Sequence, residues 1–255
     1  MKQRVVITGG AAGIGRRLGE RFAETGARVA ICDADQDAVT ALSDLYPNWI
    51  AETADVADEA AMGAFLDGVK GQWGGVDVLC ANAGTGGPAG LIEDLDYRAW
   101  QACLSVNVNG AFLACRWAAR LMRAQGSGLI LLTSSTAGLF GYPYRSPYAA
   151  AKWAIVGLTK TLAMELGPAG VRVNAIAPGA VEGDRMERVL ANESRASGKS
   201  TDALRAEYVR ATSLRSWVSA DDIADTALFL ASPAACKISG QVLPVDGHTE
   251  TLAPC

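Results

Sequence analysis

The sequence contains a single histidine, His248, which stands near its C-terminal end. Zinc and iron sites usually draw on several histidine or cysteine ligands, so we expect no metal site. Ser-His-Asp and Cys-His catalytic mechanisms are also disfavoured, because each needs an imidazole beside the nucleophile. The six cysteines form no C-x-x-C pair, which favours reduced core thiols over a disulfide framework in a chain of 255 residues.

Basic residues are not in excess, because 23 Lys and Arg stand against 27 Asp and Glu, giving a net charge of −4. Binding to nucleic acid or to an anionic membrane needs clustered positive charge, so we expect neither partner. No apolar run approaches the roughly 18 residues of a membrane span. The N-terminal residues MKQRVVITGG also lack the apolar stretch of a signal peptide. These absences predict a cytoplasmic protein.

Short apolar segments alternate with amphipathic ones along the whole sequence. Several of the apolar segments lack polar alternation, as expected for parallel strands that helices cover on both faces. This order predicts an α/β fold: a doubly wound, Rossmann-like parallel sheet in a single domain spanning residues 1–255. The expected strands are 4–8, 28–32, 49–54, 76–81, 129–134, 172–177 and 242–245, and helical patterns such as 16–25, 59–73 and 106–123 lie between them.

Residues 180–220 interrupt this alternation and contain two helical patterns, 186–196 and 202–212. Insertions of this length in a compact domain are usually functional lids. We therefore expect a helical flap over one end of the sheet that contacts the substrate. Acidic residues alternate with its basic ones, which favours a solvated helical surface over an anion clamp. The basic residues are Arg185, Arg188, Arg195, Lys199, Arg205 and Arg210.

A glycine-rich turn joins the first predicted strand to the first predicted helix. It reads Thr8-Gly9-Gly10-Ala11-Ala12-Gly13-Ile14-Gly15. Glycines at 9, 13 and 15 allow a tight turn, close approach of the backbone to a diphosphate, and close packing of the helix on the strand. The helix N-terminus attracts the phosphates. The turn, including Ile14, therefore predicts a dinucleotide-binding site.

The ends of the next three strands supply further cofactor candidates. Asp33 can accept hydrogen bonds from both ribose hydroxyls and would repel a 2′-phosphate, which favours NAD over NADP; alternatively it only begins a polar loop. Asp55 and Val56 would flank the adenine, unless Asp55 serves as a helix N-cap. The small residues of Asn82-Ala83-Gly84 would let the cofactor pass over the backbone.

The candidate catalytic residues are Ser135, Tyr148 and Lys152. Ser135 follows the fifth predicted strand, and Tyr148 and Lys152 share one face of the next helix because they are four residues apart. A free tyrosine has a pKa of about 10, which a neighbouring ammonium lowers. Tyr148 can then accept the proton of a substrate hydroxyl, while Ser135 hydrogen-bonds the substrate oxygen.

These motifs together resemble the short-chain dehydrogenase/reductase family over essentially the whole sequence. The resemblance implies a Rossmann-like fold, hydride transfer between NAD(P) and a carbonyl or alcohol, and a homotetramer. It assigns Tyr148 as the acid/base, Lys152 as its pKa modifier and ribose ligand, and Ser135 as the substrate-oxygen donor. It also rests on residues Asn107-Val108-Asn109-Gly110, Tyr148-Ala149-Ala150-Ala151-Lys152, Arg172-Val173-Asn174 and Pro178-Gly179.

The resemblance adds roles that the residues alone do not indicate. It implies that Asn107 holds a water linking Lys152 to solvent, and that the segment Pro178–Val181 lies at the nicotinamide, with Pro178, Gly179 and Val181 as contacts. Three positions depart from the family pattern. Ala81 replaces a common asparagine, and Gly183 replaces a threonine that contacts the carboxamide of the nicotinamide. His248 replaces a glycine, and for this reason we expect a different arrangement of the C-terminal tail.

The substrate is expected to meet the loops 85–90 and 138–147 and the flap. Tyr142 and Tyr144 would either contact it or pack beneath the flap, and Arg145 precedes Tyr148 by three residues. We predict an NAD-dependent oxidoreductase for a small secondary alcohol (a polyol, sugar alcohol or hydroxy acid, neutral or anionic) and its ketone. The alternatives are an NADPH-dependent 3-oxoacyl reductase and a non-catalytic NAD(H)-sensing protein.

Overall fold

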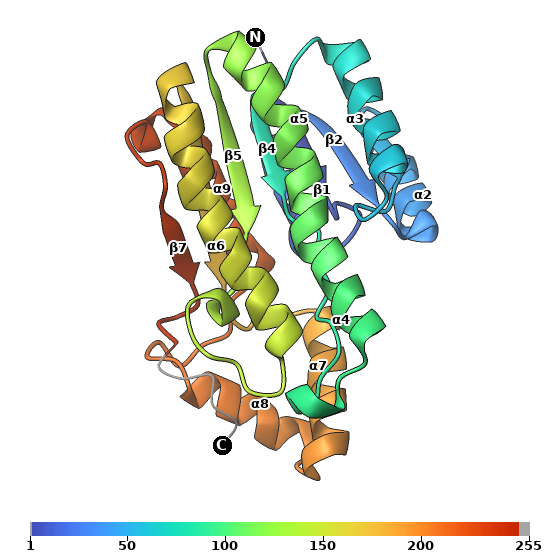
Figure 1. Ribbon diagram of the computed structural model, residues 1–255, viewed down its shortest axis with the longest axis vertical. Coiled ribbons are helices and arrows are strands. Elements are labelled where there is room, and N and C mark those ends of the chain that lie inside the picture. Colours follow the sequence, from blue (N-terminus) through green and yellow to red (C-terminus); the bar gives the residue numbers. More distant parts are fainter. Residues whose placement is uncertain (1, 250–255) are drawn as a thin grey trace.

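A computed structural model describes residues 2–249, apart from the side chains of residues 192, 196 and 197. The described residues form one parallel sheet of seven strands in the order β3-β2-β1-β4-β5-β6-β7 (Figure 1). This confirms the predicted fold class. The strands are β1 Arg4–Thr8, β2 Arg28–Asp33, β3 Ile50–Thr53, β4 Val78–Ala81, β5 Gly128–Thr133, β6 Val171–Pro178 and β7 Val242–Val245.

Helices cover both faces of the sheet. One layer holds α1 (Gly13–Glu24), α2 (Gln36–Leu45) and α9 (Ala220–Ala231); the other holds α3 (Glu59–Trp73), α5 (Gly110–Gln125) and α6 (Ser146–Leu166). Local signals set their limits. For example, the Asp58 carboxylate caps the first turn of α3 by accepting from the amides of Ala60 and Ala61, and Gly74, with φ 71°, ends that helix.

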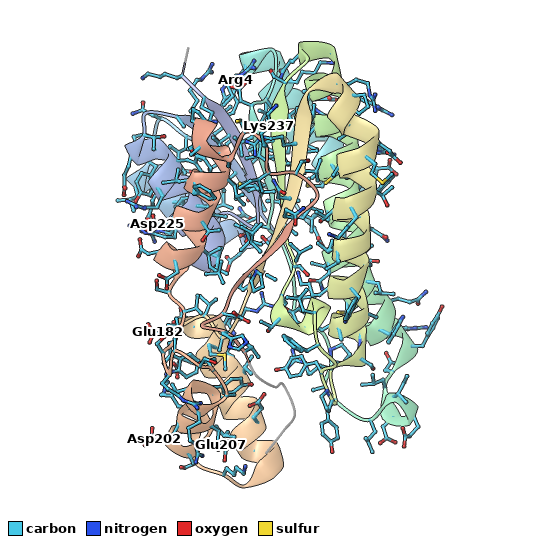
Figure 2. The ribbon with its side chains drawn as sticks, turned by 90° about the vertical axis from the view of Figure 1, so that its left-hand side faces the viewer. Arg4, Glu182, Asp202, Glu207, Asp225 and Lys237 are labelled. Carbon is cyan, nitrogen blue, oxygen red and sulfur yellow. The ribbon has the colours of Figure 1, made fainter. Side chains whose placement is uncertain are left out.

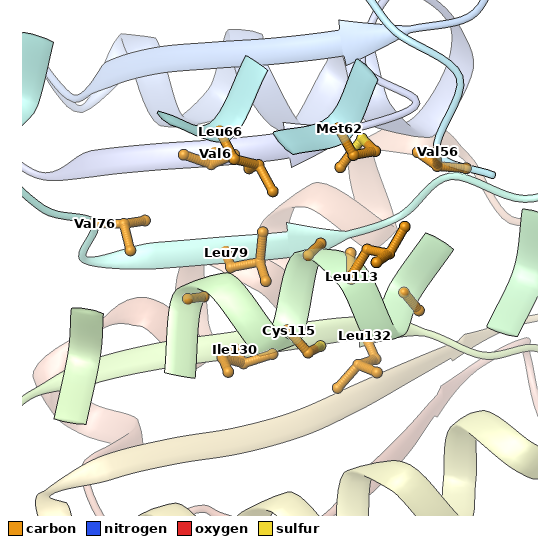
Figure 3. Close-up of a cluster of buried hydrophobic side chains, with 14 of the residues drawn as sticks. Val6, Val56, Met62, Leu66, Val76, Leu79, Leu113, Cys115, Ile130 and Leu132 are labelled. Atoms are coloured by element: carbon orange, nitrogen blue, oxygen red, sulfur yellow. The ribbon is translucent and has the colours of Figure 1, made fainter. Parts of the chain in front are cut away.

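The core lies in two clusters, one on each face of the sheet. In β1, Val6 packs with α3 and α5, whereas its neighbours Val5 and Ile7 pack on the other side with α1 and α9. All three side chains are fully buried. Figure 3 shows the first cluster, in which Leu66 of α3 and Leu79 of β4 lie close to Val6. Burial on both faces explains why these strands are apolar throughout.

The strand order reverses between β1 and β4, which opens a crevice at the carboxyl ends of the strands. Two further helices, α7 (Asp184–Ser197) and α8 (Thr201–Arg210), lie beyond those ends, below the sheet in Figure 1. They match the two helical patterns predicted for the flap. Met186, Leu190 and Leu204 form a small core of their own between α7 and α8.

The pattern predicted as one helix over 106–123 takes a different form. Helix α4 (Tyr97–Leu104) continues through a π-helical turn, η2 (Ser105–Asn109), before α5 begins. Such wide turns are rare and frequently mark functional sites. Short 3₁₀ turns also occur at η1 (Ile92–Asp94), η3 (Thr136–Gly138), η4 (Gly167–Ala169) and η5 (Pro233–Ala235).

The cysteines of the described residues are free thiols. Four of them are buried, as expected for core residues, and Cys236 is exposed. The sixth, Cys255, lies outside the described residues. Over residues 2–249, no helix combines the length and the apolar character needed to cross a membrane.

Candidate active site

The glycine turn after β1 adopts a conformation that requires its glycines. Gly9 and Gly13 have φ values of 62° and 51°, in the left-handed region that favours glycine. A Cβ atom on Gly15 would lie 1.9 Å from the carbonyl oxygen of Gly9, and one on Gly9 would lie 2.8 Å from Cα of Ala83. Close packing of helix on turn, and of turn on β4, therefore excludes larger residues at both positions.

This turn carries the features of a phosphate site. Helix α1 begins at Gly13 directly after Ala12, which has no side chain to cap the first amides, and the first turn contains no acidic residue. Its amides and the positive end of its dipole are therefore available to an anion. Asp33, at the end of β2, accepts a hydrogen bond from the Ala11 amide at 3.1 Å, which places its carboxylate beside the turn. The set fits a dinucleotide.

Two other cofactor candidates have clear structural tasks. Asn82 donates to the carbonyls of Thr8 (3.2 Å) and Gly9 (3.1 Å) and accepts from the hydroxyl of Thr133, which ties β1, β4 and β5 together. Asp55 is exposed and accepts from the Ala57 amide at 2.9 Å, while the N-cap of α3 is Asp58.

Val56 is buried, and a Cβ on Gly110 would lie 2.7 Å from its side chain. Its contacts are therefore those of a core residue. An adenine contact at Asp55 or Val56 stays a prediction.

The catalytic candidates Ser135, Tyr148 and Lys152 meet at the carboxyl end of β5. Tyr148 and Lys152 lie one turn apart on α6, and Nζ of Lys152 is 5.5 Å from the centroid of the tyrosine ring. The ammonium is buried and donates to the Thr133 carbonyl at 2.9 Å. Helix α6 is held in place by Ser134, whose hydroxyl donates to the Lys152 carbonyl at 3.0 Å.

The surroundings of Tyr148 favour its ionised form. Burial opposes ionisation, but the positive charges of Lys152 and Arg185, together with a hydrogen bond to Ser135 and the charge of Arg145, outweigh it and lower the pKa of Tyr148. Burial and the nearby Arg185 lower the pKa of Lys152, although the phenol acts in the opposite direction. The site can therefore hold a phenolate and release or accept a proton there.

Asn107 lies in the π-helical turn and is buried next to Lys152. Its amide nitrogen donates to the carbonyls of Thr85 (3.0 Å) and Cys103 (2.9 Å). Its carbonyl oxygen is buried and has no hydrogen-bond partner within the described residues. A Cβ on Gly84 would lie 2.7 Å from that oxygen and 3.3 Å from Nζ of Lys152. Glycine at position 84 thus leaves a polar space between the two side chains.

The two predicted substrate loops lie side by side. The Gly90 amide donates to the Tyr144 carbonyl at 2.9 Å, and Arg145 donates to the Gly86 carbonyl at 2.8 Å. An open hollow of about 380 Å³ lies there, lined by residues 90–92, 142–144 and 146. Tyr142 hydrogen-bonds Tyr208 of α8, which donates to Glu193 of α7 at 2.8 Å. Tyr142 therefore both borders the hollow and supports the flap, while Tyr144 is 52 % exposed.

The segment after β6 leads into the flap. The Gly179 amide donates to the Val245 carbonyl at 3.0 Å, and a Cβ on Gly179 would lie 2.7 Å from Cβ of Asp246. Val181 pairs with Val218, and Gly183, with φ 128°, precedes α7. The nicotinamide contacts predicted for Pro178, Gly179 and Val181 stay predictions.

The tail keeps the backbone that a glycine would take at position 248. His248 has φ 62°, and its amide donates to the Asp246 carboxylate at 2.9 Å. The left-handed conformation is therefore compatible with the glycine that the family usually has there. The imidazole Nδ1 lies 2.6 Å from the Ser213 hydroxyl.

Two residues of the site, although named in the sequence analysis, have contacts that the sequence did not assign to them. The guanidinium carbon of Arg185, on α7, lies 5.9 Å from the centroid of the Tyr148 ring. In the sequence, the acidic residues around Arg185 suggest a solvent-exposed position for it. The pattern that could have placed it at the site is its spacing of one helical turn before Val189, at the edge of the apolar face of α7. Thr8 is the second, because its hydroxyl accepts from the amides of Asn82 and Ala83, both at 3.1 Å.

Comparison with known proteins agrees with this geometry. A family described as Enoyl-(Acyl carrier protein) reductase matches residues 9–248. Cis-4-hydroxycyclohexanecarboxylate dehydrogenase of Sinomonas cyclohexanicum is 34% identical over 95% of this chain and 94% of its own.

Two solved structures extend the comparison. An NAD⁺-bound xylitol dehydrogenase has a TM-score of 0.90 and 28% identity, covering 96% of this chain and 98% of its own. An actinorhodin polyketide ketoreductase with NADPH has a TM-score of 0.92 and 28% identity, covering 96% of both chains. With its glycine turn and its Ser135, Tyr148 and Lys152 side chains at the strand ends, the chain belongs to the short-chain dehydrogenase/reductase family of NAD(P)-dependent oxidoreductases.

Proposed function

We propose that the protein uses NAD to oxidise a small secondary alcohol, such as a polyol, sugar alcohol or hydroxy acid, and catalyses the reverse reduction of the ketone. The observation that carries this proposal is the convergence of Lys152, Arg185 and Ser135 on the phenol of Tyr148, which lowers its pKa. A phenol whose pKa is lowered in this way can take the hydroxyl proton of an alcohol at a lower pH than a free tyrosine.

Each side chain has one task in the proposed mechanism. Tyr148 removes the proton from the substrate hydroxyl, and Ser135 hydrogen-bonds the same oxygen and orients it. Lys152 stabilises the phenolate and, from its position at the end of β5, would bind the ribose of the cofactor, as the family resemblance implies. The bound nicotinamide supplies the hydride acceptor. Asn107 presents its carbonyl oxygen to the space beside Lys152, which supports a proton path to solvent through that space.

The preference for NAD rests on Asp33. Its carboxylate ends β2 beside the phosphate turn, where a 2′-phosphate would meet a negative charge. We expect Asp33→Asn to weaken NAD⁺ binding about ten- to hundredfold, because a charge-assisted hydrogen bond is lost, and to narrow the gap to NADP⁺. The measurement is kcat/KM for both cofactors. Asp37→Asn, on the exposed side of α2, is the control, and an unchanged cofactor ratio in Asp33→Asn would overturn the assignment.

The second candidate is NADPH-dependent reduction of a 3-oxoacyl thioester. Similarity to the polyketide ketoreductase complexed with NADPH supports it, and the charge of Asp33 opposes it. A panel of alcohols, sugars and hydroxy acids with NAD⁺ and NADP⁺, run beside a 3-oxoacyl thioester with NADH and NADPH, separates the two. Faster turnover of the thioester with NADPH than of any alcohol with NAD⁺ would replace the first candidate by the second.

We also propose a homotetramer, located in the cytoplasm. Large apolar side chains are exposed on two long helices of one layer: Phe112 (48 %) on α5, and Trp153 (50 %) and Met164 (81 %) on α6. Sedimentation velocity of the wild type and of Met164→Lys tests the assembly, and a monomeric wild type would contradict it. The free thiols support a reducing compartment.

A further inference from the structure

Two arginines from different parts of the chain meet at Tyr148. Arg145 belongs to the loop before α6, and its guanidinium carbon lies 5.7 Å from the centroid of the Tyr148 ring. Arg185 approaches from α7 of the flap, with its guanidinium carbon at 5.9 Å from the same centroid. Together with Lys152, at 5.5 Å, they place three cationic groups around one phenol.

The two arginines differ in their partners from Arg205 and Lys199 of the flap. Arg205 pairs with Glu187 at 2.6 Å, and Lys199 pairs with Glu207 at 2.8 Å. Within residues 2–249, no salt bridge engages Arg145 or Arg185. Arg145 uses one nitrogen on the Gly86 carbonyl, and its buried Nε has no partner among the described residues.

One carboxylate of the flap lies at the side of this cluster. Glu193 of α7 contributes negative charge near Tyr142, and its oxygen accepts the hydroxyl of Tyr208 at 2.8 Å. Three cations crowded at one place repel each other, and an unpaired buried donor costs free energy. An anion at this position relieves both effects. A guanidinium also presents two parallel N–H groups that match carboxylate, sulfonate and phosphate oxygens.

We propose that the substrate carries an anionic group, a carboxylate, sulfonate or phosphate, which Arg145 and Arg185 bind beside Tyr148. This inference rests on the proposed function, because it takes the substrate hydroxyl to lie at the Tyr148 oxygen. The anion then stands only a few bonds from the reacting carbon, which selects short hydroxy acids and their sulfonate or phosphate counterparts. Because Arg185 lies on α7 and Arg145 directly precedes α6, a bound anion would link the flap to the catalytic helix.

The test compares anionic and neutral substrates of matched shape. The probes are 3-hydroxybutanoate with 3-hydroxybutanamide, 2-hydroxypropane-1-sulfonate with its sulfonamide, and propane-1,2-diol 1-phosphate with propane-1,2-diol. We expect the wild type to prefer one anionic member at least tenfold in kcat/KM, and the favoured pair identifies the anion. Both members of a pair are compared on the high-pH plateau, where the effect of Arg185 on the pKa of Tyr148 no longer changes the rate. There Arg185→Gln should lower kcat/KM for that anion, mainly through KM, about ten- to hundredfold more than for its neutral partner.

Arg188→Gln is the matched control. Arg188 is exposed on α7 and has no ring contact with Tyr148 among the described residues, so its replacement removes the same charge from the same helix. Equal losses for the anionic and neutral members in Arg185→Gln would show that the arginine acts only on the pKa of Tyr148, and would overturn the proposal. A similar selective loss of kcat/KM for the anion in Arg188→Gln would show only a general attraction of anions to the basic flap, and would also overturn the proposal.

A binding measurement separates this inference from the proposed function. Calorimetric titration of the enzyme–NADH complex with 3-oxobutanoate, 2-oxopropane-1-sulfonate and hydroxyacetone phosphate requires no turnover. Binding that is lost in Arg185→Gln and kept in Arg188→Gln supports the anion site even if no alcohol is oxidised, which would refute the proposed function alone. Turnover of neutral alcohols with no anion binding would refute the anion site and keep the proposed function.

Discussion

At the amino-terminal edge of the sheet, where its strands begin, Arg4 and Asp77 share three hydrogen bonds of 2.7–2.9 Å. At the carboxyl-terminal edge, where the strands end, three residues each have a buried polar side-chain atom without a hydrogen-bond partner among residues 2–249: Asn107, Arg145 and Ser146. Figure 2 shows the long axis of the molecule, with Arg4 at one end and Glu207 of the flap at the other. The same sheet thus ends in a satisfied network and in an unsatisfied one.

The difference shows how the fold separates stability from binding. The Arg4–Asp77 pair links the beginnings of β1 and β4, and Gln125 of α5 joins it by accepting from Arg4 at 3.3 Å. The charged and amide groups of this network already hydrogen-bond one another. At the other edge, unpaired groups raise the free energy of the folded chain, and a bound molecule can recover that free energy.

Removing the hydroxyl of Tyr148, at the carboxyl-terminal edge, should give the largest effect, and this effect should fall on catalysis. We expect Tyr148→Phe to lower kcat about 10²- to 10⁴-fold, the usual contribution of a general acid/base, with NADH affinity near that of the wild type. Stopped-flow turnover and NADH fluorescence titration measure the two quantities. Tyr97→Phe, at an exposed tyrosine of α4, is the control. Retention of most activity in Tyr148→Phe would contradict the proposed mechanism, in which Tyr148 is the acid/base.

Breaking the network at the opposite edge should affect stability and leave catalysis intact. We expect Asp77→Asn to lower the free energy of unfolding by about 1–2 kcal/mol, since charge-assisted hydrogen bonds are lost from a partly exposed pair. Urea unfolding measures it. Glu59→Gln breaks the more exposed Glu59–Arg116 pair and should cost less than about 0.5 kcal/mol. A large fall in kcat for Asp77→Asn would contradict the separation of the two edges.

Asp77→Asn should also change how the free energy of unfolding depends on pH. Burial raises the pKa of Asp77, but its hydrogen bonds and ion pair with Arg4 outweigh this and lower the pKa in the folded protein. The stabilisation is therefore present above the ordinary aspartate pKa and is lost as pH falls through the lowered one. Unfolding curves of wild type and Asp77→Asn should converge in acid. A gap that stays constant from pH 7 to pH 3 would show that Asp77 acts by packing alone.

The smallest expected effect concerns the charge of Arg185. Because this charge helps to lower the pKa of Tyr148, Arg185→Gln should move the rising limb of the pH profile for neutral-alcohol oxidation to higher pH. Rates on the plateau should not change. The profile of kcat/KM measures the shift, and Arg188→Gln should superimpose on the wild type. A downward shift would contradict the assigned electrostatics.

Sequence patterns were sufficient for features that depend on local order. The limits of β1, β7 and α3 agree with the expected ranges. Apolar strand segments, helix caps and glycine turns are determined by residues that are close together in the sequence, which is why these limits could be predicted. The spacing of Tyr148 and Lys152 likewise predicted their shared face. Their roles rest on the chemistry of the pocket and stay proposals.

Other features depend on distant contacts and could not be predicted. The pairing of Arg4 with Asp77 joins residues 73 positions apart. The approach of Arg185 to Tyr148 depends on how α7 packs, and the alternating charges of the flap suggested a solvated surface instead. The π-helical turn at Asn107 was also hidden, because the apolar pattern of 106–123 continues smoothly through it.

That wide turn has a consequence for how the chain tolerates change. A π-helical turn accommodates one residue more than a regular helix does in the same span, and each residue of a regular helix rotates the chain by about 100°. Deleting a single residue between 105 and 109 would let α4 and α5 fuse into an uninterrupted helix. With α5 fixed against the sheet, the whole of α4 would rotate by about 100° around its axis and turn a different face toward α6. The enzyme therefore depends on a count of residues here as much as on their identity.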